Sequence, residues 1–273
     1  MELTNWDEVL LPYGQAVDEL MVKFKSLANG YSRMDSISPI EQVDGRVKRV
    51  SSILEKANRK GIPINLISEK IEDIGGIRII CRFIGDIEKV IELIRVRNGV
   101  DLEISTERDY ITKRKSSGYR SYHVIIKYPV ITVTGYSRVL CEIQIRTLAM
   151  NFWATIEHSL RYKYQGRLPE HLHQRLIASS EAAAKLDSEL NEIRDEILDA
   201  QTSYKNKTEL IDEILAGIQA LSYNSKVEYA SDINDQFFSL YESGDYDGLI
   251  ELNRKLKLMT DTHKKSPHRR RDD

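Results

Sequence analysis

The stretch VLCEIQIRTLAMNFWATIEH, residues 139 to 158, predicts a strand that turns directly into a helix. Alternate residues from Val139 to Ile145 are apolar and fall on one face of the strand, whereas Glu142, Gln144 and Arg146 fall on the other. A carboxylate and an amide on one strand face suit a polar pocket. A strand with one face in solvent has the same pattern, so this stretch alone leaves both interpretations open.

The predicted helix begins after Thr147, which occupies the position of an N-cap. Its apolar stripe at helical spacing consists of Leu148, Phe152, Ile156 and Leu160. A second face carries Asn151, Ala154 and His158, which brings another amide and an imidazole close to the strand. Trp153 and His158 are interpreted as structural residues, because a helix packed on a sheet satisfies its polar groups internally.

The chain of 273 residues is long enough for one substantial domain with an appendage, or for two small domains. Charged residues make up 30% and apolar residues 41%, and no apolar run approaches the roughly 20 residues that span a bilayer. The start, MELTNWDEVL, does not read as a signal peptide, so we expect a soluble cytoplasmic protein. A net charge of −2 gives no overall electrostatic case for nucleic-acid binding.

The two cysteines, Cys81 and Cys141, lie inside apolar strand-like runs. This placement favours reduced thiols packed as small apolar groups over a disulfide or a metal site. The six histidines show no spacing typical of a zinc site either.

Two helices are predicted in the first sixty residues. Apolar residues recur every three or four positions from Trp6 to Leu27, which indicates an amphipathic helix with Pro12 in the first turn of its main part. A basic helix is predicted within SPIEQVDGRVKRVSSILEKANRKG, residues 38 to 61. Its apolar stripe would consist of Val47, Val50, Leu54 and Ala57. Its opposite face would carry Lys48, Ser52, Lys56 and Arg59, and Arg46 and Arg49 would lie beside that face.

The charge of this basic helix is one-sided. Residues 46 to 60 hold six Lys or Arg and a single acid, Glu55. A solvated face usually mixes both signs, so the pattern indicates anion binding, although a solvated face remains the alternative.

Residues 71 to 84, IEDIGGIRIICRFI, predict a second core strand with Asp73 near its start and Arg78 on its polar side. Gly75 and Gly76 either permit a tight entry into the strand or let a ligand approach the backbone. A helix over residues 86 to 97 and a strand over 101 to 106 are expected to follow.

The segment RDYITKRKSSGYRSYHVIIKY, residues 108 to 128, combines basic, small and aromatic residues. Basic groups offset phosphate charge, and a tyrosine ring stacks on a base for roughly 1–3 kcal/mol, so this composition suits a nucleotide. A mobile surface loop is the alternative. Residues 124 to 129 should form a strand that ends at Pro129, and a turn over 134 to 137 returns the chain as a hairpin into the opening stretch.

From Pro169 onward only helices are predicted. Leucines and isoleucines from Leu172 to Ile197 repeat every 3.5 to 3.6 residues and need a partner, in the chain or across an oligomer interface. Further helices are expected over residues 209–222, 226–243 and 246–260, followed by a disordered basic tail, 263–273. The predicted organisation is thus a main domain over residues 1–200 and a helical extension over 205–262.

Polar groups from three predicted strands could meet in one place: Asp73, His123, Glu142 and Gln144. Two carboxylates that meet repel each other unless a cation lies between them, and Mg²⁺ prefers carboxylate and phosphate oxygens. Mg²⁺ with a nucleoside triphosphate therefore accounts for this combination. There is no GxxxxGK[ST] sequence and no histidine followed by aspartate, which excludes the P-loop and HD motifs.

Several motifs in a fixed order resemble the synthetase domain of the RelA/SpoT homologues, and more narrowly the single-domain small alarmone synthetases. They are GRVK at 45–48, SSILEK at 51–56, EDIGGIRI at 72–79, RDYI at 108–111, KSSGYRSYH at 115–123 and EIQIRTLAMNFWATIEH at 142–158. The resemblance covers about residues 5 to 200, and nothing carries over to residues 205–273. It implies an α+β fold, a mixed β-sheet of about five strands flanked by helices, related to nucleotidyltransferases.

The resemblance implies pyrophosphoryl transfer from ATP to the ribose 3′-hydroxyl of GTP or GDP, which gives pppGpp or ppGpp and AMP, with no hydrolase activity. It implies Mg²⁺ held by Asp73 and Glu142, with Glu142 also orienting or deprotonating the attacking hydroxyl. It also implies a homo-oligomer, since related proteins assemble as tetramers. The choice between GTP and GDP stays open, as does the role of the extension, which could cap the oligomer, inhibit the site or recruit a partner.

The resemblance also assigns binding residues. For ATP they are Arg46, Lys48, Ser52, Lys56, Arg59, Arg78 and Arg108, of which Arg46 and Arg78 would sandwich the adenine. For GTP or GDP they are Lys115, Tyr119, His123, Gln144 and Asn151, of which Tyr119 would stack on guanine.

Two other classes of protein are possible. An inactive nucleotide-binding regulator is disfavoured because the recognised motifs keep all their functional groups. An RNA-binding protein that uses the basic segment 108–120 and the tail is disfavoured by the slightly acidic net charge.

Overall fold

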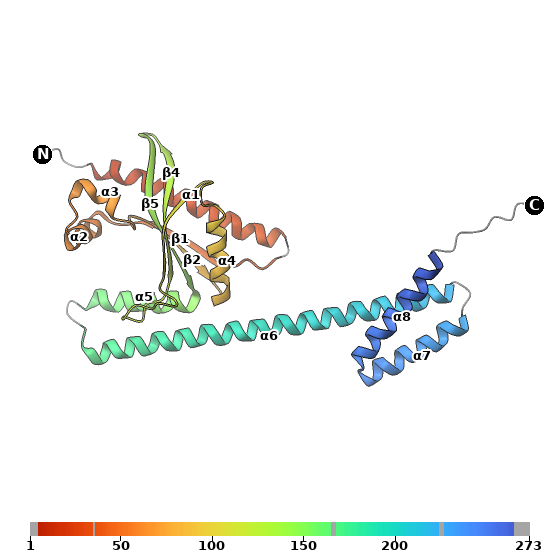
Figure 1. Cartoon of the computed structure of the whole chain (residues 1–273). Helices are drawn as coiled ribbons and strands as arrows, with labels where there is room; N and C mark the ends of the chain where they lie inside the picture. The colour runs from red at the N-terminus through yellow and green to blue at the C-terminus, as the bar shows by residue number, and fades with distance from the viewer. Residues whose placement is uncertain (1–4, 35, 165–167, 224–226, 265–273) are drawn as a thin grey trace, which may run out of the picture. The chain divides into compact units, whose positions relative to one another are not determined.

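The computed structural model describes residues 5–34, 36–164, 168–223 and 227–264. The chain divides into two compact units, Met1–Glu192 and Ile193–Asp273 (Figure 1). The boundary between them falls inside the long helix α6, Glu170–Tyr223.

The first unit is built on one five-stranded sheet in the order β1-β2-β5-β4-β3. Strands β2 and β5 run parallel, and every other neighbouring pair is antiparallel, so the predicted mixed sheet is confirmed. The strands are β1 Gln42–Val47, β2 Gly75–Cys81, β3 Glu103–Asp109, β4 Tyr122–Thr132 and β5 Gly135–Thr147.

Helices α1 and α4 supply most of the helical side of the core. They pack against the apolar face of the sheet, where Cys141, Ile143 and Ile145 of β5 are fully buried. The helices of this unit are α1 Trp6–Arg33, α2 Val50–Lys60, α3 Ile67–Lys70, α4 Ile84–Arg95, α5 Leu148–Lys163 and the first part of α6, with a short 3₁₀ turn η1 at Ile64–Leu66. Because side chains alternate along a strand, the residues between the buried ones, among them Glu142 and Gln144, face the other way.

The basic helix is shorter than predicted. Arg46 and Val47 belong to strand β1, which pairs with β2, and the helix begins only at Val50. The backbone amide of Lys48 donates to the carbonyl of Ile74, which continues the strand pairing and keeps Lys48 out of the helix. The buried side of α2 is Ile53 and Ala57, whereas Leu54 of the predicted stripe is exposed.

Pro12 lies inside α1, which starts at Trp6, and the buried residues of this helix, from Tyr13 to Phe24, all follow the proline. Two further boundary predictions were wrong. Strand β4 continues past Pro129. The first residue of β3, Glu103, pairs with Lys127, so β3 does not extend alongside Pro129 and the missing amide of the proline faces an unpaired edge. Helix α6 is continuous where two helices were expected, because residues 197–209 contain neither glycine nor proline.

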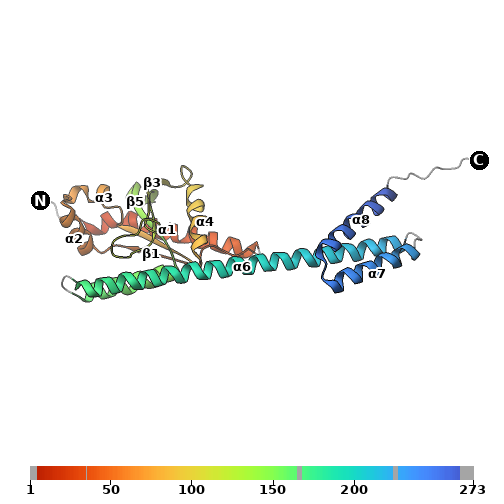
Figure 2. The ribbon, with the colours of Figure 1, turned by 60° about the horizontal axis from the view of Figure 1, so that its bottom comes forward.

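Helix α5 turns its predicted apolar stripe away from the sheet. Leu148, Phe152 and Ile156 are 49%, 71% and 45% exposed, whereas Met150 and Trp153 are buried. The exposed residues line a groove of about 720 Å³ between α5 and the first part of α6, which lie side by side in Figures 1 and 2.

The second unit packs three helices around its own apolar cluster. It consists of the end of α6, α7 Val227–Ser243 and α8 Tyr246–Lys264. Its core includes Ile214, Phe237 and Leu252, one from each helix. The disordered tail was predicted over residues 263–273, but residues 263 and 264 belong to α8, and the rest lies outside the described residues. No helix of the described residues could cross a membrane.

Candidate active site

The polar side chains predicted from the opening stretch lie together with those of two neighbouring strands. In the sheet register, Gln144 of β5 stands beside Arg78 of β2 on one side and His123 of β4 on the other. Glu142 is paired with Gly76 of β2, which has no side chain. Strand pairing therefore places a carboxylate, an amide, an imidazole and a guanidinium on one face of the sheet.

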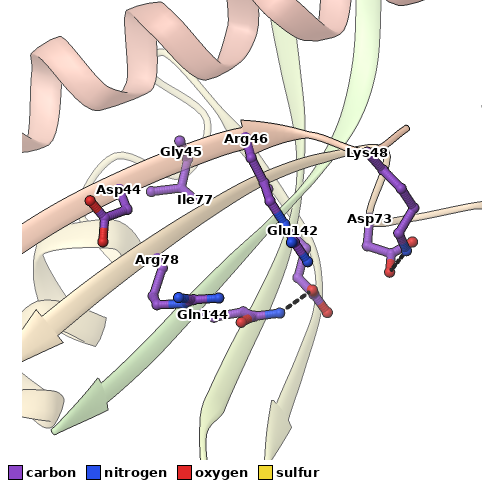
Figure 3. Close-up of a pocket in the computed structure, with 10 residues that line it drawn as sticks. Asp44, Gly45, Arg46, Lys48, Asp73, Ile77, Arg78, Glu142 and Gln144 are labelled. Carbon is purple, nitrogen blue, oxygen red and sulfur yellow. Dashed lines mark hydrogen bonds and ion pairs between the residues drawn. The ribbon is translucent and has the colours of Figure 1, made fainter. Parts of the chain in front are cut away.

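A pocket of about 170 Å³ opens on this face (Figure 3). Figure 3 shows the side chains of Arg46 and Arg78 projecting to the side of the sheet that carries Glu142 and Gln144. The pocket is lined by six of the predicted site residues, Arg46, Lys48, Asp73, Arg78, Glu142 and Gln144, together with Asp44, Gly45, Gly76 and Ile77.

Asp73 is held by two lysines. Its Oδ2 atom lies 2.6 Å from Nζ of Lys48 and 2.7 Å from Nζ of Lys56. Burial acts to raise the pKa of the Asp73 carboxyl, but the hydrogen bonds and charges of the two lysines outweigh it and lower the pKa. The Oδ1 atom is buried and has no hydrogen-bond partner among the described residues. Asp73 thus keeps one oxygen without a hydrogen bond among the described residues.

Glu142 is bonded through both oxygens. Its Oε1 lies 2.8 Å from Nδ1 of His123, and its Oε2 accepts from Nε2 of Gln144 at 2.7 Å. Burial acts to raise the pKa of Glu142, but these two hydrogen bonds and the charge of His123 outweigh it, so the pKa is lowered. Glu142 is therefore ionised at neutral pH and a weak base.

A set of rings continues from His123 toward the basic segment. The Tyr119 hydroxyl lies 2.9 Å from Nε2 of His123, and the Tyr110 ring meets the His123 ring edge to face at 5.1 Å. The Lys115 ammonium lies 4.2 Å from the centroid of the Tyr110 ring and 4.9 Å from that of Tyr119. Burial lowers the pKa of Lys115, and the charges of Arg108, Lys56 and Arg146 add to this against the attraction of Glu142.

The remaining predicted residues lie around this centre. Arg108 makes a two-point contact with Glu72, with both N···O distances at 2.8 Å. Ser52 and Arg59 are exposed on α2 and do not line the pocket. Asn151 lies in the first turn of α5, and its Oδ1 atom is buried without a hydrogen-bond partner in the described part of the chain.

Trp153 and His158 differ in their surroundings. The Trp153 indole donates to the carbonyl of Leu176 and to Oγ of Ser179, which ties α5 to α6. His158 is exposed, so the internal satisfaction expected of it does not apply.

Three residues of the site were not assigned from the sequence. Arg146 is buried beside Tyr119 and Gln144, Glu72 pairs with Arg108, and Tyr110 lies under Lys115. The alternation of β5 already placed Arg146 on the polar face, so that signal was present. Glu72 precedes β2 and pairs with Arg108 of β3, which is distant in the sequence, so this pairing had no local signal.

No group of three or more His, Cys, Asp or Glu side chains that could hold a metal occurs among the described residues. A metal at this pocket would instead take ligands from Asp73, Glu142 and a substrate. This arrangement is typical of Mg²⁺, which is commonly bound by one or two carboxylates together with phosphate oxygens.

Comparisons with known proteins are consistent with this chemistry. A family model described as the region found in RelA / SpoT proteins matches residues 45–167. GTP pyrophosphokinase YjbM of Bacillus subtilis is 53% identical over 207 residues, which cover 76% of this chain and 97% of that protein. GTP pyrophosphokinase YwaC of the same organism is 40% identical over 71% of this chain and 93% of its own length.

The fold is also similar to solved structures of such proteins. The crystal structure of the small alarmone synthetase 1 from Bacillus subtilis bound to its product pppGpp has a TM-score of 0.68 and 54% identity. It covers 71% of this chain and 99% of that chain. A structure of the same synthetase bound to AMPCPP has a TM-score of 0.63 and 49% identity, and covers 72% of this chain and all of that one.

Proposed function

The chain belongs to the RelA/SpoT family, and from this membership we propose that it is a GTP pyrophosphokinase. It transfers the β,γ-pyrophosphate of ATP to the 3′-hydroxyl of GTP or GDP and releases AMP. The observation that carries this proposal is the meeting of Asp73 and Glu142 with Arg46, Lys48 and Arg78 in one pocket. Pyrophosphoryl transfer needs positioning and charge stabilisation rather than a protein nucleophile, which suits this set of side chains.

On the donor side, Arg46 and Arg78 come from neighbouring antiparallel strands and would hold the adenine between them. The ATP phosphates and ribose would lie near four cations, Lys48, Lys56, Arg59 and Arg108. Ser52, at the start of α2, would also contact them. Lys48 and Lys56 now neutralise Asp73, and an incoming triphosphate would take over these two cations. The exchange leaves the Asp73 carboxylate ionised and open to a metal.

Mg²⁺ fits this donor set, because the unused Oδ1 of Asp73 and the ionised Glu142 line the same pocket. Mg²⁺ held there would neutralise charge on the phosphate oxygens and orient them. The lowered pKa of Glu142 supports a role in which it orients the attacking hydroxyl more than it removes the proton.

On the acceptor side, Tyr119 would stack on guanine and Lys115 and His123 would bind the acceptor phosphates. Gln144 and Asn151 would contact the nucleoside, and the unpartnered Oδ1 of Asn151 supports such a contact. The nucleotides that the reaction consumes are cytoplasmic metabolites, which supports a cytoplasmic location.

The proposed synthetase domain covers residues 1–200, and it would act as a homo-oligomer, a tetramer by resemblance. The apolar groove between α5 and the first part of α6 supports this, because Phe152 in that groove is 71% exposed and a second copy of the chain would cover it. A second copy of the chain is the proposed occupant. Light scattering should give a multiple of 31.5 kDa, and Phe152→Asp should lower the measured mass. A monomeric mass for the unaltered chain would contradict the proposal.

Two alternatives predict different results. An inactive regulator would bind nucleotides without turnover, and an RNA-binding protein would use the basic segment. Arg108 of that segment is paired with Glu72, and Lys115 lies over the Tyr110 ring, which leaves fewer cations for RNA. Purified protein incubated with ATP, GTP and Mg²⁺ should yield equimolar AMP and a more anionic guanosine nucleotide on ion exchange. Absence of both would contradict the proposed function.

A further inference from the structure

We infer that Arg146 is a positioning residue, which fixes the side chains of Tyr119, Gln144, His123 and Glu142 through one closed ring of hydrogen bonds. The inference rests on the proposed function, in which those four side chains bind or orient the acceptor nucleotide. Arg146 itself does not line the pocket. It acts through the residues that it holds.

Arg146 is a buried cation without an acidic partner. Only 5% of the residue is exposed, and no carboxylate of the described residues pairs with it. Its guanidinium donates to the hydroxyls of Ser121 and Tyr119 and to the amide oxygen of Gln144. Burying an unpaired guanidinium costs several kcal/mol, so a residue at this position serves a purpose other than stability.

Two chains of hydrogen bonds start from one atom, Nη2 of Arg146, and end on the two oxygens of Glu142. The first chain passes through Tyr119 and His123. Nη2 lies 2.5 Å from the Tyr119 hydroxyl, and this hydroxyl lies 2.9 Å from Nε2 of His123. Nδ1 of His123 then lies 2.8 Å from Oε1 of Glu142. In the second, Nη2 donates to Oε1 of Gln144 at 2.8 Å, and Nε2 of Gln144 donates to Oε2 of Glu142 at 2.7 Å.

Arg146 and Glu142 together fix the directions of the hydrogen bonds that they make. A guanidinium has no acceptor, so the Tyr119 oxygen must accept from Arg146. The ionised Glu142 has no donor, so Nδ1 of His123 donates to it. In the same way, Gln144 must present its oxygen to Arg146 and its NH₂ group to Glu142. Without Arg146, the Tyr119 oxygen would lose this donor, and the Gln144 amide would be held by Glu142 alone.

The guanidinium also restrains the Tyr119 ring directly. Its central carbon lies 5.0 Å from the ring centroid, within the range of a cation–π contact. The backbone of Arg146 is fixed in turn, because it is paired with Ile80 of β2 and precedes the N-cap Thr147, which accepts from the amide of Met150. A rigid strand end thus carries the residue that sets the acceptor side chains.

The test compares Arg146→Gln with the unaltered full-length chain. Loss of the ring should raise KM for GTP by about tenfold or more, because hydrogen bonds to charged groups are each worth ~1.5–3 kcal/mol. KM for ATP should stay within about twofold, because Arg46 and Arg78 are not in the ring. Arg146→Lys, which keeps the charge and a donor, should recover part of the loss. Arg138→Gln, the same change at an exposed position of β5, should alter neither constant.

A merely structural role would give another result. If Arg146→Gln lowers Tm and raises both KM values alike, or leaves KM for GTP unchanged, the inference is wrong. If that variant does not fold, a double-mutant cycle of Arg146→Lys with Tyr119→Phe decides, because the two changes should be less than additive in KM for GTP. Additive effects would overturn the inference. Failure of the proposed function is distinguishable, since the unaltered chain would then form no product at all.

Discussion

Tyr119 is the residue that we propose to stack on the guanine of the acceptor nucleotide. Its ring lies near two cations, with Lys115 at 4.9 Å and Arg146 at 5.0 Å from the centroid, and edge to face with the rings of Tyr110 and His123. Such surroundings fix the plane of the ring before a nucleotide arrives. A base that stacks on it therefore loses little free energy in ordering the side chain.

Replacing Tyr119 by alanine should weaken GTP binding by roughly 1–3 kcal/mol, because the stacking surface is lost. Isothermal titration with GTP alone measures this, and titration with a non-hydrolysable ATP analogue should show no change. Tyr136→Ala, at a tyrosine of the hairpin that is 65% exposed, serves as the matched control. Unchanged GTP affinity in the Tyr119 variant would contradict its assignment.

At this scale the sequence predicted side chains better than their partners. The alternation in EIQIR placed Glu142 and Gln144 on a polar face, and the structure confirms it. The bond between Arg108 and Glu72 and the ring around Arg146 join residues from segments that are distant in the sequence. Such pairings depend on sheet register, which a one-residue shift would abolish, and no single segment encodes them.

Strand β1 and helix α1 approach each other closely at Gly45. A Cβ atom on Gly45 would lie 2.6 Å from Sδ of Met21 and 2.6 Å from Cγ1 of Val17. The thioether of Met21 can move, but the β-branched Val17 is stiff, so the contact requires glycine. Gly45 directly precedes Arg46, which links this contact to the pocket.

Gly45→Ala should lower the free energy of unfolding by about 1–3 kcal/mol, because it overpacks the interface between helix and strand. Urea unfolding measures this change. Gly14→Ala, in α1 with open space around its Cβ position, should instead stabilise by roughly 0.5–1 kcal/mol, since it favours the helix. Equal stability of the two variants would contradict the close approach.

A second link ties α1 to the turn after α4 and depends on pH. Asp101 accepts hydrogen bonds from Arg97 and from Lys23 of α1. These contacts lower the pKa of Asp101 from 3.8 to about 2, and the hydrogen bond from Arg97 has the largest effect. Because the pKa is lower in the folded state, the ion pair stabilises the fold above pH 3.8, and this contribution is lost as pH falls toward 2.

Asp101→Asn should therefore destabilise the chain by roughly 1 kcal/mol near pH 6, and the difference from the unaltered chain should shrink below pH 4. Urea unfolding at several pH values tests this, with Asp18→Asn on the exposed side of α1 as a control. A difference that does not vary with pH would show that the charge of Asp101 is not what matters.

Element types were predictable where a pattern was long, and their ends were not. The hairpin of β4 and β5 and the helix α4 follow their periodicity. The basic helix was started too early because Val47 and Val50 also fit a helical stripe, and the pairing of β1 with β2 decided otherwise. Pairing with a distant strand competes with local helix propensity and cannot be seen in the segment itself.

The described part of the chain holds two hydrophobic cores with no residue in common. The first belongs to the unit that carries the site, and the second joins the end of α6 with α7 and α8. YjbM matches 76% of this chain over 97% of its own length, and YwaC matches 71% of this chain over 93% of its own length. The additional part of this chain is therefore not a general requirement of the family.

A chain truncated after Tyr204 should remain folded and keep its synthetase activity within about twofold, because every residue of the pocket and of the first core lies before that point. Circular dichroism and product formation measure the two properties. A folded but inactive fragment would instead assign residues 205–264 a part in catalysis, and a much more active one would make them an inhibitor.

Pyrophosphoryl transfer to the 3′-hydroxyl is tested most directly by following the transferred phosphates and the acceptor oxygen in one assay. With ATP labelled at the β-phosphate, the label should appear on the guanosine product in a one-to-one ratio to AMP. 2′-DeoxyGTP should serve as acceptor, whereas 3′-deoxyGTP and the Glu142→Gln variant should give no labelled product. Release of ADP, or transfer to 3′-deoxyGTP, would contradict pyrophosphoryl transfer to the 3′-hydroxyl at this site.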